Sequence, residues 1–226
     1  MRSNSRLIAT QEVFTESVND LISIAEGPLV EEIFADQILA SRVGVPPSIS
    51  KPFDYRLCVT PDALGLVRAS FGDCDALVIE KGEPHRGSAI QFKRVKISES
   101  SHKTGRMNKL GELPKAVRQA SELHAVGFAN VWLTVLVVAD LRSLHDASQR
   151  RFTPPSMIDV VTAALPLHDL ASGVGVTVCE ITQISTAPEF WRGGSGGTLI
   201  RHVTERPQPQ ALTDAIARMF SGAPAS

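Results

Sequence analysis

The stretch VWLTVLVVAD at residues 131–140 constrains the fold of this chain more than any other segment. Its side chains are apolar at odd and even positions almost alike, so a strand formed here has no polar face to present to water. Such a strand is typical of the centre of a sheet that is covered on both faces. The run is also too short to cross a bilayer, because a helical span needs about 20 apolar residues. We therefore predict a central strand between two layers of helices.

The remaining segments supply helices and strands in an order that suits such a sheet. The spacing of apolar residues predicts helices over 10–26, 28–42, 114–126, 156–165 and 209–220, with EGP at 26–28 separating the first two. Strands are expected in DYRLCV, LGLVRASF, DALVIE, SAIQFKRVKI, GVGVTVCEITQIS and TLIRHV. The expected fold class is α/β, with a mixed central β-sheet flanked by helices.

The composition is that of an ordinary globular protein. Hydrophobic residues make up 43% of the chain, and the net charge of −1 gives no overall attraction to nucleic acid or to a membrane. The three cysteines, Cys58, Cys74 and Cys179, lack the spacing of a zinc site, and their odd number indicates reduced thiols. The N-terminal stretch MRSNSRLIATQEVF has no apolar signal-peptide core. We expect a cytoplasmic protein.

Polar residues occupy unusual positions in the stretch CDALVIEKGEPHRGSAIQFKRVKI, residues 74–97. Asp75 begins one strand, and Gln91 and Lys93 share one face of the next because side chains alternate along a strand. An antiparallel hairpin with KGEPHRG as its connection returns the chain beside Asp75. We therefore expect Asp75 to lie near Gln91 and Lys93.

These three side chains suit metal-assisted hydrolysis. A carboxylate, an amide oxygen and a backbone carbonyl are hard ligands for Mg²⁺, or for Mn²⁺ in its place. A bound Mg²⁺ stabilises charge on a phosphoryl oxygen and lowers the pKa of a bound water. The ammonium of Lys93 is suited to orient that water or to offset the growing negative charge.

The pattern D75ALVI followed by A89IQFK93 resembles the PD-(D/E)xK nuclease superfamily, with Gln in the Q-x-K variant of the motif. The resemblance spans about residues 28–140 and implies a restriction-endonuclease-like αβββαβ core. It also implies that Asp75, Gln91 and Lys93 are catalytic and that Asp75 and Gln91 bind metal. Gln in place of Glu removes one negative charge, so the resemblance requires a further carboxylate.

The family takes such a carboxylate from its first helix, where this chain has Glu31 and Glu32. We place Val30, Ile33, Phe34, Ile38 and Ser41 on the inward face of that helix. An advance of ~100° per residue then sets Glu31 on the flank of this face and Glu32 nearly opposite. Glu31 is therefore the expected third metal ligand and catalytic residue.

The resemblance also divides the chain into three parts. Residues 1–27 form an N-terminal helical segment and residues 28–140 the nuclease-like core. Residues 141–226 are expected to be a C-terminal α/β extension of the same domain. They leave little room for a separate recognition domain.

A basic segment begins on the strand that carries Gln91 and Lys93 and continues directly after it. Residues 93–118 contain eight Lys or Arg against two Glu, a local excess of +6 in a chain whose total is −1. Lys and Arg contact phosphates irrespective of base sequence, although a lysine-rich loop is also an ordinary solvated surface. The expected nucleic-acid-binding residues are Lys96, Lys103, Arg106, Lys109, Lys115 and Arg118.

Three interpretations remain open at this stage. The first is a Mg²⁺-dependent endonuclease that hydrolyses phosphodiester bonds in nucleic acid, with DNA as the expected substrate. The second is an inactive nuclease-fold module that binds nucleic acid or a protein partner in a defence or repair system. The third is an α/β domain of unrelated role.

The expected assembly is a homodimer or a larger defence or repair complex. Many enzymes that cut both strands act as symmetric pairs, and by that analogy the terminal helix around Leu212, Ile216 and Phe220 is a candidate dimer contact. No contact with a membrane is expected.

Overall fold

One mixed β-sheet organises the computed structural model, which describes residues 21–46, 48–49, 52–66, 72–142, 155–183, 188–191 and 199–221. Within these ranges its seven strands are β1 (Phe53–Val59), β2 (Cys74–Glu80), β3 (Ser88–Ile97), β4 (Asn130–Asp140), β5 (Gly175–Gln183), β6 (Pro188–Trp191) and β7 (Leu199–Arg201). Strands β1, β2 and β3 pair antiparallel, whereas β3, β4 and β5 pair parallel. Both β6 and β7 pair antiparallel with β5. The expected α/β fold with a mixed central sheet is confirmed.

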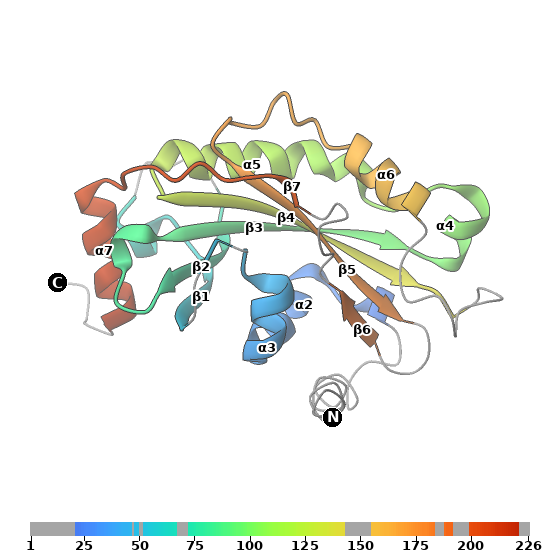
Figure 1. Ribbon diagram of the computed structural model, residues 1–226, viewed down its shortest axis with the longest axis horizontal. Helices are drawn as coiled ribbons and strands as arrows, with labels where there is room; N and C mark the ends of the chain where they lie inside the picture. Colours follow the sequence, from blue (N-terminus) through green and yellow to red (C-terminus); the bar gives the residue numbers. More distant parts are fainter. Residues whose placement is uncertain are drawn as a thin grey trace.

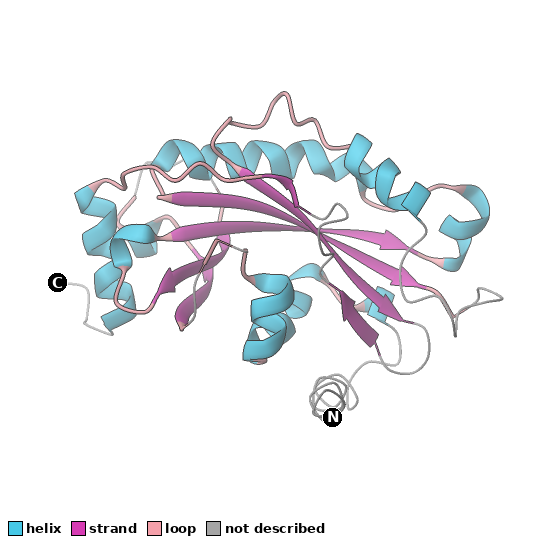
Figure 2. Cartoon of the chain, viewed as in Figure 1, coloured by secondary structure: helices cyan, strands magenta, loops and turns pink. Residues whose placement is uncertain are grey.

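Helices cover both faces of this sheet (Figures 1 and 2). One layer contains α5 (Leu113–Val126), α6 (Pro155–Ala163) and α7 (Gln210–Ser221). The other contains α2 (Glu26–Ala35), α3 (Gln37–Leu39) and the π-helical η2 (Ala40–Gly44). The shorter elements are η1 (Leu21–Ser23), η3 (Asp62–Leu64), η4 (Pro84–Arg86), α4 (Glu99–Thr104) and η5 (Leu110–Glu112). None of the helices in the described ranges has the length and hydropathy that a membrane span requires.

Strand β4 is the centre of the sheet, as its sequence predicts. It lies between β3 and β5, and every residue from Asn130 to Ala139 is buried. Val131, Leu133 and Val135 join the core under α5, while Trp132 and Leu136 join the core under α2. The apolar character of both faces is therefore explained by two separate cores.

The N-terminal helix differs from the expected 28–42. Helix α2 begins at Glu26 and ends at Ala35, and EGP forms its first turn instead of a break. Pro28 is tolerated there because the first N–H groups of a helix have no intrahelical acceptor. The expected helix over 10–26 lies outside the described residues up to position 20.

Three other expectations about local structure need correction. Leu64 ends a 3-10 helix and Gly65 turns the chain with φ +70°, so the described part of LGLVRASF is not a strand; residues 67–71 lie outside the described ranges. The polar stretch after β3 contains α4, which is stabilised by a capping box between Ser98 and Ser101. Strand β6 was not predicted, because four residues carry too little pattern.

Two of the three residues expected at a dimer contact on the terminal helix α7 lie inside the chain's own core. Leu212 and Ile216 are buried in the core that α5 and β4 share. Phe220 packs against the same core, and the guanidinium of Arg56 lies 5.0 Å from the centre of its ring. Leu212 and Ile216 are therefore not accessible to a second copy, whereas Phe220 stays half-buried.

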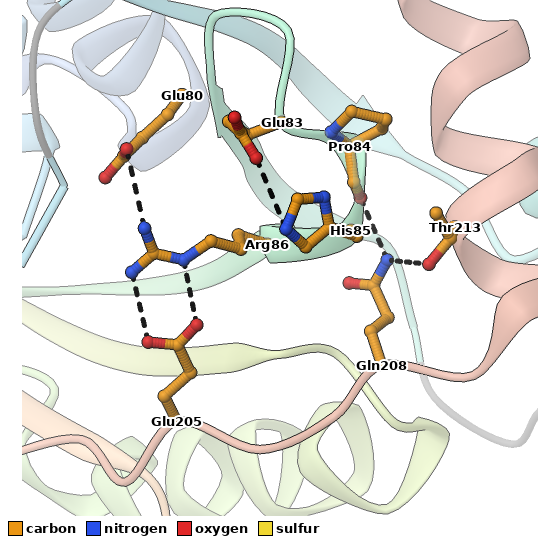
Figure 3. A network of polar contacts seen from close by, with 8 residues as sticks. All are labelled: Glu80, Glu83, Pro84, His85, Arg86, Glu205, Gln208 and Thr213. Carbon is orange, nitrogen blue, oxygen red and sulfur yellow. Dashed lines mark hydrogen bonds and ion pairs between the residues drawn. The ribbon is translucent and has the colours of Figure 1, made fainter.

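The segment before α7 holds the tip of the β2–β3 hairpin (Figure 3). Arg86 donates to both carboxylate oxygens of Glu205, at 2.8 and 3.0 Å. Gln208 donates through Nε2 to the carbonyl of Pro84 and to Oγ1 of Thr213, both at 2.9 Å. These contacts fix the hairpin at the end remote from Asp75.

Candidate active site

Strand β3 continues past the point where β2 stops pairing with it. The β2–β3 register covers Ala76 to Val78 against Ile90 to Ser88, whereas β3 runs on to Ile97. Two carboxylates accept hydrogen bonds from N–H groups that β2 leaves unpaired on this edge. Oδ2 of Asp75 accepts from Phe92 at 2.7 Å, and Oε2 of Glu26 accepts from Arg94 at 2.5 Å. The open edge of β3 is thus lined by two acids that backbone donors hold in place.

Gln91 lies beside the first of these acids. Its Nε2 donates to Oδ2 of Asp75, the same oxygen that accepts from Phe92. The side chain is buried, and its Oε1 has no hydrogen-bonding partner. A buried amide oxygen without a donor is costly, so this atom is available to a cation or a donor from outside the chain.

Lys93 lies between two carboxylates. Its Nζ is 2.8 Å from Oε2 of Glu112 and 3.6 Å from Oε1 of Glu26. Burial lowers the pKa of Lys93, but the hydrogen bonds and charges of Glu112 and Glu26 outweigh burial and raise it overall. The side chain is therefore a cation at neutral pH, and it is 13% exposed.

We call the side chains that meet at this edge the cluster: Glu26, Asp75, Gln91, Lys93 and Glu112. Within it, the carboxyl group of Asp75 has the largest pKa shift. Burial raises its pKa to about 7, and the neighbouring charge of Glu26 adds to the rise. The hydrogen bonds from Phe92 and Gln91 and the charge of Lys93 act in the opposite direction without cancelling it. A carboxyl group in this state binds either a proton or a metal cation readily near neutral pH.

The structure brings Asp75, Gln91 and Lys93 together and places Glu31 apart from them. Glu31 is exposed on α2, and no hydrogen bond or ion pair joins it to the described residues of the cluster. The charge of Glu31 contributes instead to the raised pKa of Cys58, which burial raises most and the charge of Asp75 raises further. The carboxylate that α2 contributes to the cluster is Glu26.

Sequence reasoning missed Glu26 because it assigned EGP to a break between helices. The useful signal was an acid in the first turn of a helix, where carboxylates are favoured.

Sequence reasoning also missed Arg94, which is 4% exposed and whose Nε and Nη1 have no hydrogen-bonding partner. Burial lowers the pKa of Arg94, and the charge of Glu26 partly offsets that effect. Glu26 therefore lies near two basic side chains.

The basic segment follows the cluster over α4, η5 and the start of α5. Lys103, Arg106, Lys115 and Arg118 are exposed, and Lys96 and Lys109 are half-buried. Lys103 forms an ion pair with Glu99 at 2.6 Å. The four exposed cations are accessible to a large anionic partner.

The described residues contain no group of three or more His, Cys, Asp or Glu side chains arranged to hold a metal ion. A cation at this edge would therefore need the amide oxygen of Gln91 or backbone carbonyls beside the carboxylates. Asp75, Glu26 and Gln91 supply three oxygen-bearing side chains, and Mg²⁺ accepts such ligands with several waters retained.

Comparison with models of protein families gives no match, and comparison with curated proteins gives none either.

Proposed function

We propose that this protein is a Mg²⁺-dependent nuclease that hydrolyses phosphodiester bonds in DNA. The observation that carries the proposal is the convergence of Asp75, Gln91 and Lys93 where β3 extends beyond β2. Acceptance of the Phe92 N–H explains Asp75 in part, but it does not explain why an amide and an amine lie at the same open sheet edge. The acid, the amide and the amine match the groups needed to hold a cation and to stabilise charge on a phosphoryl oxygen.

The order of the elements supports the resemblance to the PD-(D/E)xK superfamily. Leaving aside the short elements α3, α4 and η2–η5, helix α2 is followed by the antiparallel strands β1, β2 and β3, then by α5, and then by β4 parallel to β3. This is the αβββαβ order expected of a restriction-endonuclease-like core. The resemblance places its catalytic residues on the second and third strands, where Asp75 and Gln91 lie.

The residues present fit a magnesium ion. Oε1 of Gln91 is buried without a donor, and the half-buried carboxyl group of Asp75 has a pKa that is raised by burial and by the charge of Glu26. Both features are relieved by a cation that accepts oxygen ligands. Asp75, Gln91 and Glu26 would hold the ion, with Glu26 in place of the expected Glu31. Bound Mg²⁺ would supply a more acidic water and charge stabilisation at the phosphate.

The chain's own groups have separate tasks. The N–H groups of Phe92 and Arg94 orient the carboxylates of Asp75 and Glu26, so little rearrangement is needed when substrate arrives. Lys93 remains protonated and presents a positive charge to the scissile phosphate. The exposed cations Lys115 and Arg118 contact neighbouring phosphates and position the strand.

Cleavage of plasmid and linear DNA tests the proposal. Purified protein is incubated with each substrate in Mg²⁺, in Mn²⁺ and in EDTA, beside Lys93→Met and Lys81→Met. Lys81 is an exposed lysine in the β2–β3 connection, so its variant has the same charge change away from the cluster. We expect metal-dependent cleavage by the wild type and by Lys81→Met and loss of cleavage in Lys93→Met. Equal cleavage by all three proteins excludes the role of Lys93.

The alternative is an inactive module of the same fold that binds nucleic acid, or a protein partner in a defence or repair system. Two observations favour it: Gln91 presents nitrogen, not oxygen, to Asp75, and no three-acid group is present among the described residues. This alternative predicts salt-sensitive DNA binding in EDTA that survives Gln91→Ala. Loss of binding in EDTA counts against it.

A further inference from the structure

Glu112 is the most exposed member of the cluster around Lys93. It is the last residue of η5 and the N-cap of α5, and its side chain makes no capping hydrogen bond. Instead, its Oε2 lies 2.8 Å from Nζ of Lys93, with 47% of the Glu112 side chain exposed against 13% for Lys93. An exposed acid thus covers a largely buried ammonium group.

The same carboxylate lies among two further lysines. Lys109 and Lys115 are three residues before and after Glu112 in the chain. The hydrogen bond and charge of Lys93 lower the pKa of Glu112, and Lys109 and Lys115 add to that effect. Helix α5 begins at the next residue, so the positive end of its dipole is also close. Three lysines, one of them in direct contact, therefore act electrostatically on one carboxylate.

Of the two acids that contact Lys93, Glu112 is the one able to leave. Glu26 is held by the N–H of Arg94 at 2.5 Å. Within the described residues, the carboxylate of Glu112 has Lys93 as its hydrogen-bonding partner and no other. Rotation of the exposed Glu112 side chain would free Lys93 for another anion without disturbing the sheet edge.

We propose that Glu112 occupies a phosphate-binding position formed by Lys93, Lys109 and Lys115, and that a phosphate of the nucleic-acid backbone replaces its carboxylate. The site takes a phosphate of a nucleic-acid strand because three ammonium groups and a helix N-terminus attract a polyanion whose successive phosphates together carry more charge than one carboxylate. The identification of that phosphate as part of a DNA strand rests on the proposed function.

Binding of inorganic pyrophosphate, measured by calorimetry in EDTA, tests the position directly. Glu112→Gln keeps the shape of the side chain and removes its charge. Glu99→Gln is the matched control, because Glu99 is the other acid of residues 93–118 and pairs with Lys103 away from Lys93. We expect Glu112→Gln to bind pyrophosphate about tenfold tighter than the wild type and Glu99→Gln to stay within about twofold. Adding Lys93→Met to Glu112→Gln should remove the gain.

Two results overturn the proposal: a Glu112→Gln variant that binds no tighter than Glu99→Gln, or a gain that persists without Lys93. A labelled DNA duplex, titrated in EDTA with the same variants, separates this proposal from the nuclease. A pyrophosphate gain in a protein that neither binds nor cuts DNA supports the phosphate position and removes the nuclease. Cleavage of DNA with equal duplex affinity in Glu112→Gln and Glu99→Gln supports the nuclease and removes the phosphate position.

Discussion

The carboxylate of Asp75 accepts the backbone N–H of Phe92 at 2.7 Å and thereby takes the place of a strand partner on β3. The same oxygen accepts from Nε2 of Gln91. Asp75 therefore has a structural task at the open sheet edge in addition to the proposed chemical one. The two tasks make different demands, because an acceptor of any charge satisfies the N–H, whereas a metal ion requires the carboxylate.

Asp75→Asn separates these two tasks. The Asn side-chain oxygen retains an acceptor for Phe92, so we expect the free energy of unfolding to change by less than about 1 kcal/mol near pH 4, where folded Asp75 is protonated and therefore neutral like Asn. Cleavage should fall by about a hundredfold to a thousandfold, as is typical when one electrostatic contributor is removed. Urea unfolding and a plasmid cleavage assay measure the two effects. Asp75→Ala serves as the comparison, because it leaves a buried N–H unpaired and should cost about 1–3 kcal/mol.

The raised pKa of Asp75 predicts a pH dependence of stability. The pKa of Asp75 rises to about 7 in the folded protein because of burial and the charge of Glu26, whereas in the unfolded chain it has its ordinary value of about 3.9. Between these values the folded protein keeps a proton that the unfolded chain has lost, so stability decreases as pH rises from about 4 to 7. The destabilisation caused by ionising Asp75 is therefore absent below about pH 4 and constant above about pH 7.

Urea midpoints across this pH range measure the effect. We expect the wild type to lose about 2–4 kcal/mol more than Asp75→Asn, since one pKa unit corresponds to about 1.4 kcal/mol. Millimolar Mg²⁺ should restore part of the loss at pH 8, because the cation binds the ionised carboxylate. Parallel pH curves for the two proteins would show that Asp75 titrates normally.

A third prediction decides which carboxylate of α2 belongs to the site. Glu26 contacts Lys93 and the N–H of Arg94, whereas Glu31 is exposed on the same helix. Glu26→Gln should reduce the single-turnover cleavage rate by at least about tenfold and raise the Mg²⁺ concentration needed for half-maximal rate. Glu31→Gln carries the same chemical change and should stay within about twofold. The reverse order would return the role to Glu31, as the sequence predicts.

The sheet was predictable because buried strands have apolar residues in a recognisable pattern. The unbroken apolar run of β4 required a covered central position, and the helix α5 followed from the period of its apolar residues. The polar hairpin was also visible, because Asp75, Gln91 and Lys93 lie at fixed positions on two strands joined by a short connection.

The partners of Lys93 were not predictable in the same way. Glu26 reaches it from a helix whose start was misplaced, because Gly27 and Pro28 are typical of a break as well as of a first turn. Glu112 reaches it from a segment of mostly polar residues with little periodicity. Both contacts depend on how α2 and η5 pack on the edge of β3, and packing between distant segments leaves no local pattern.

A fourth prediction concerns the basic segment. Arg118 is exposed on α5, and a contact with one phosphate releases about one counterion. In EDTA, Arg118→Ala should reduce the slope of log affinity against log salt by about 1, with a similar loss for unrelated duplex sequences. Lys81→Ala, on the hairpin connection, should leave the slope unchanged. Fluorescence anisotropy with a labelled duplex at several salt concentrations gives both slopes, and equal slopes would remove Arg118 from the interface.

The last prediction concerns the contacts that fix the motif hairpin at its far end (Figure 3). Gln208 donates to the carbonyl of Pro84 and to Thr213, and its Oε1 accepts from the N–H of Ala129 at 3.3 Å. Gln208→Ala leaves these partly buried groups without a partner, so we expect a loss of about 1–3 kcal/mol in the free energy of unfolding. Gln210→Ala is the matched control, because Gln210 is exposed and bonds to Asp214 within α7. Because the contacts lie remote from Asp75, cleavage per folded molecule should be unchanged in both variants. A selective loss of cleavage in Gln208→Ala would instead show that the hairpin tip controls the position of Asp75 and Gln91.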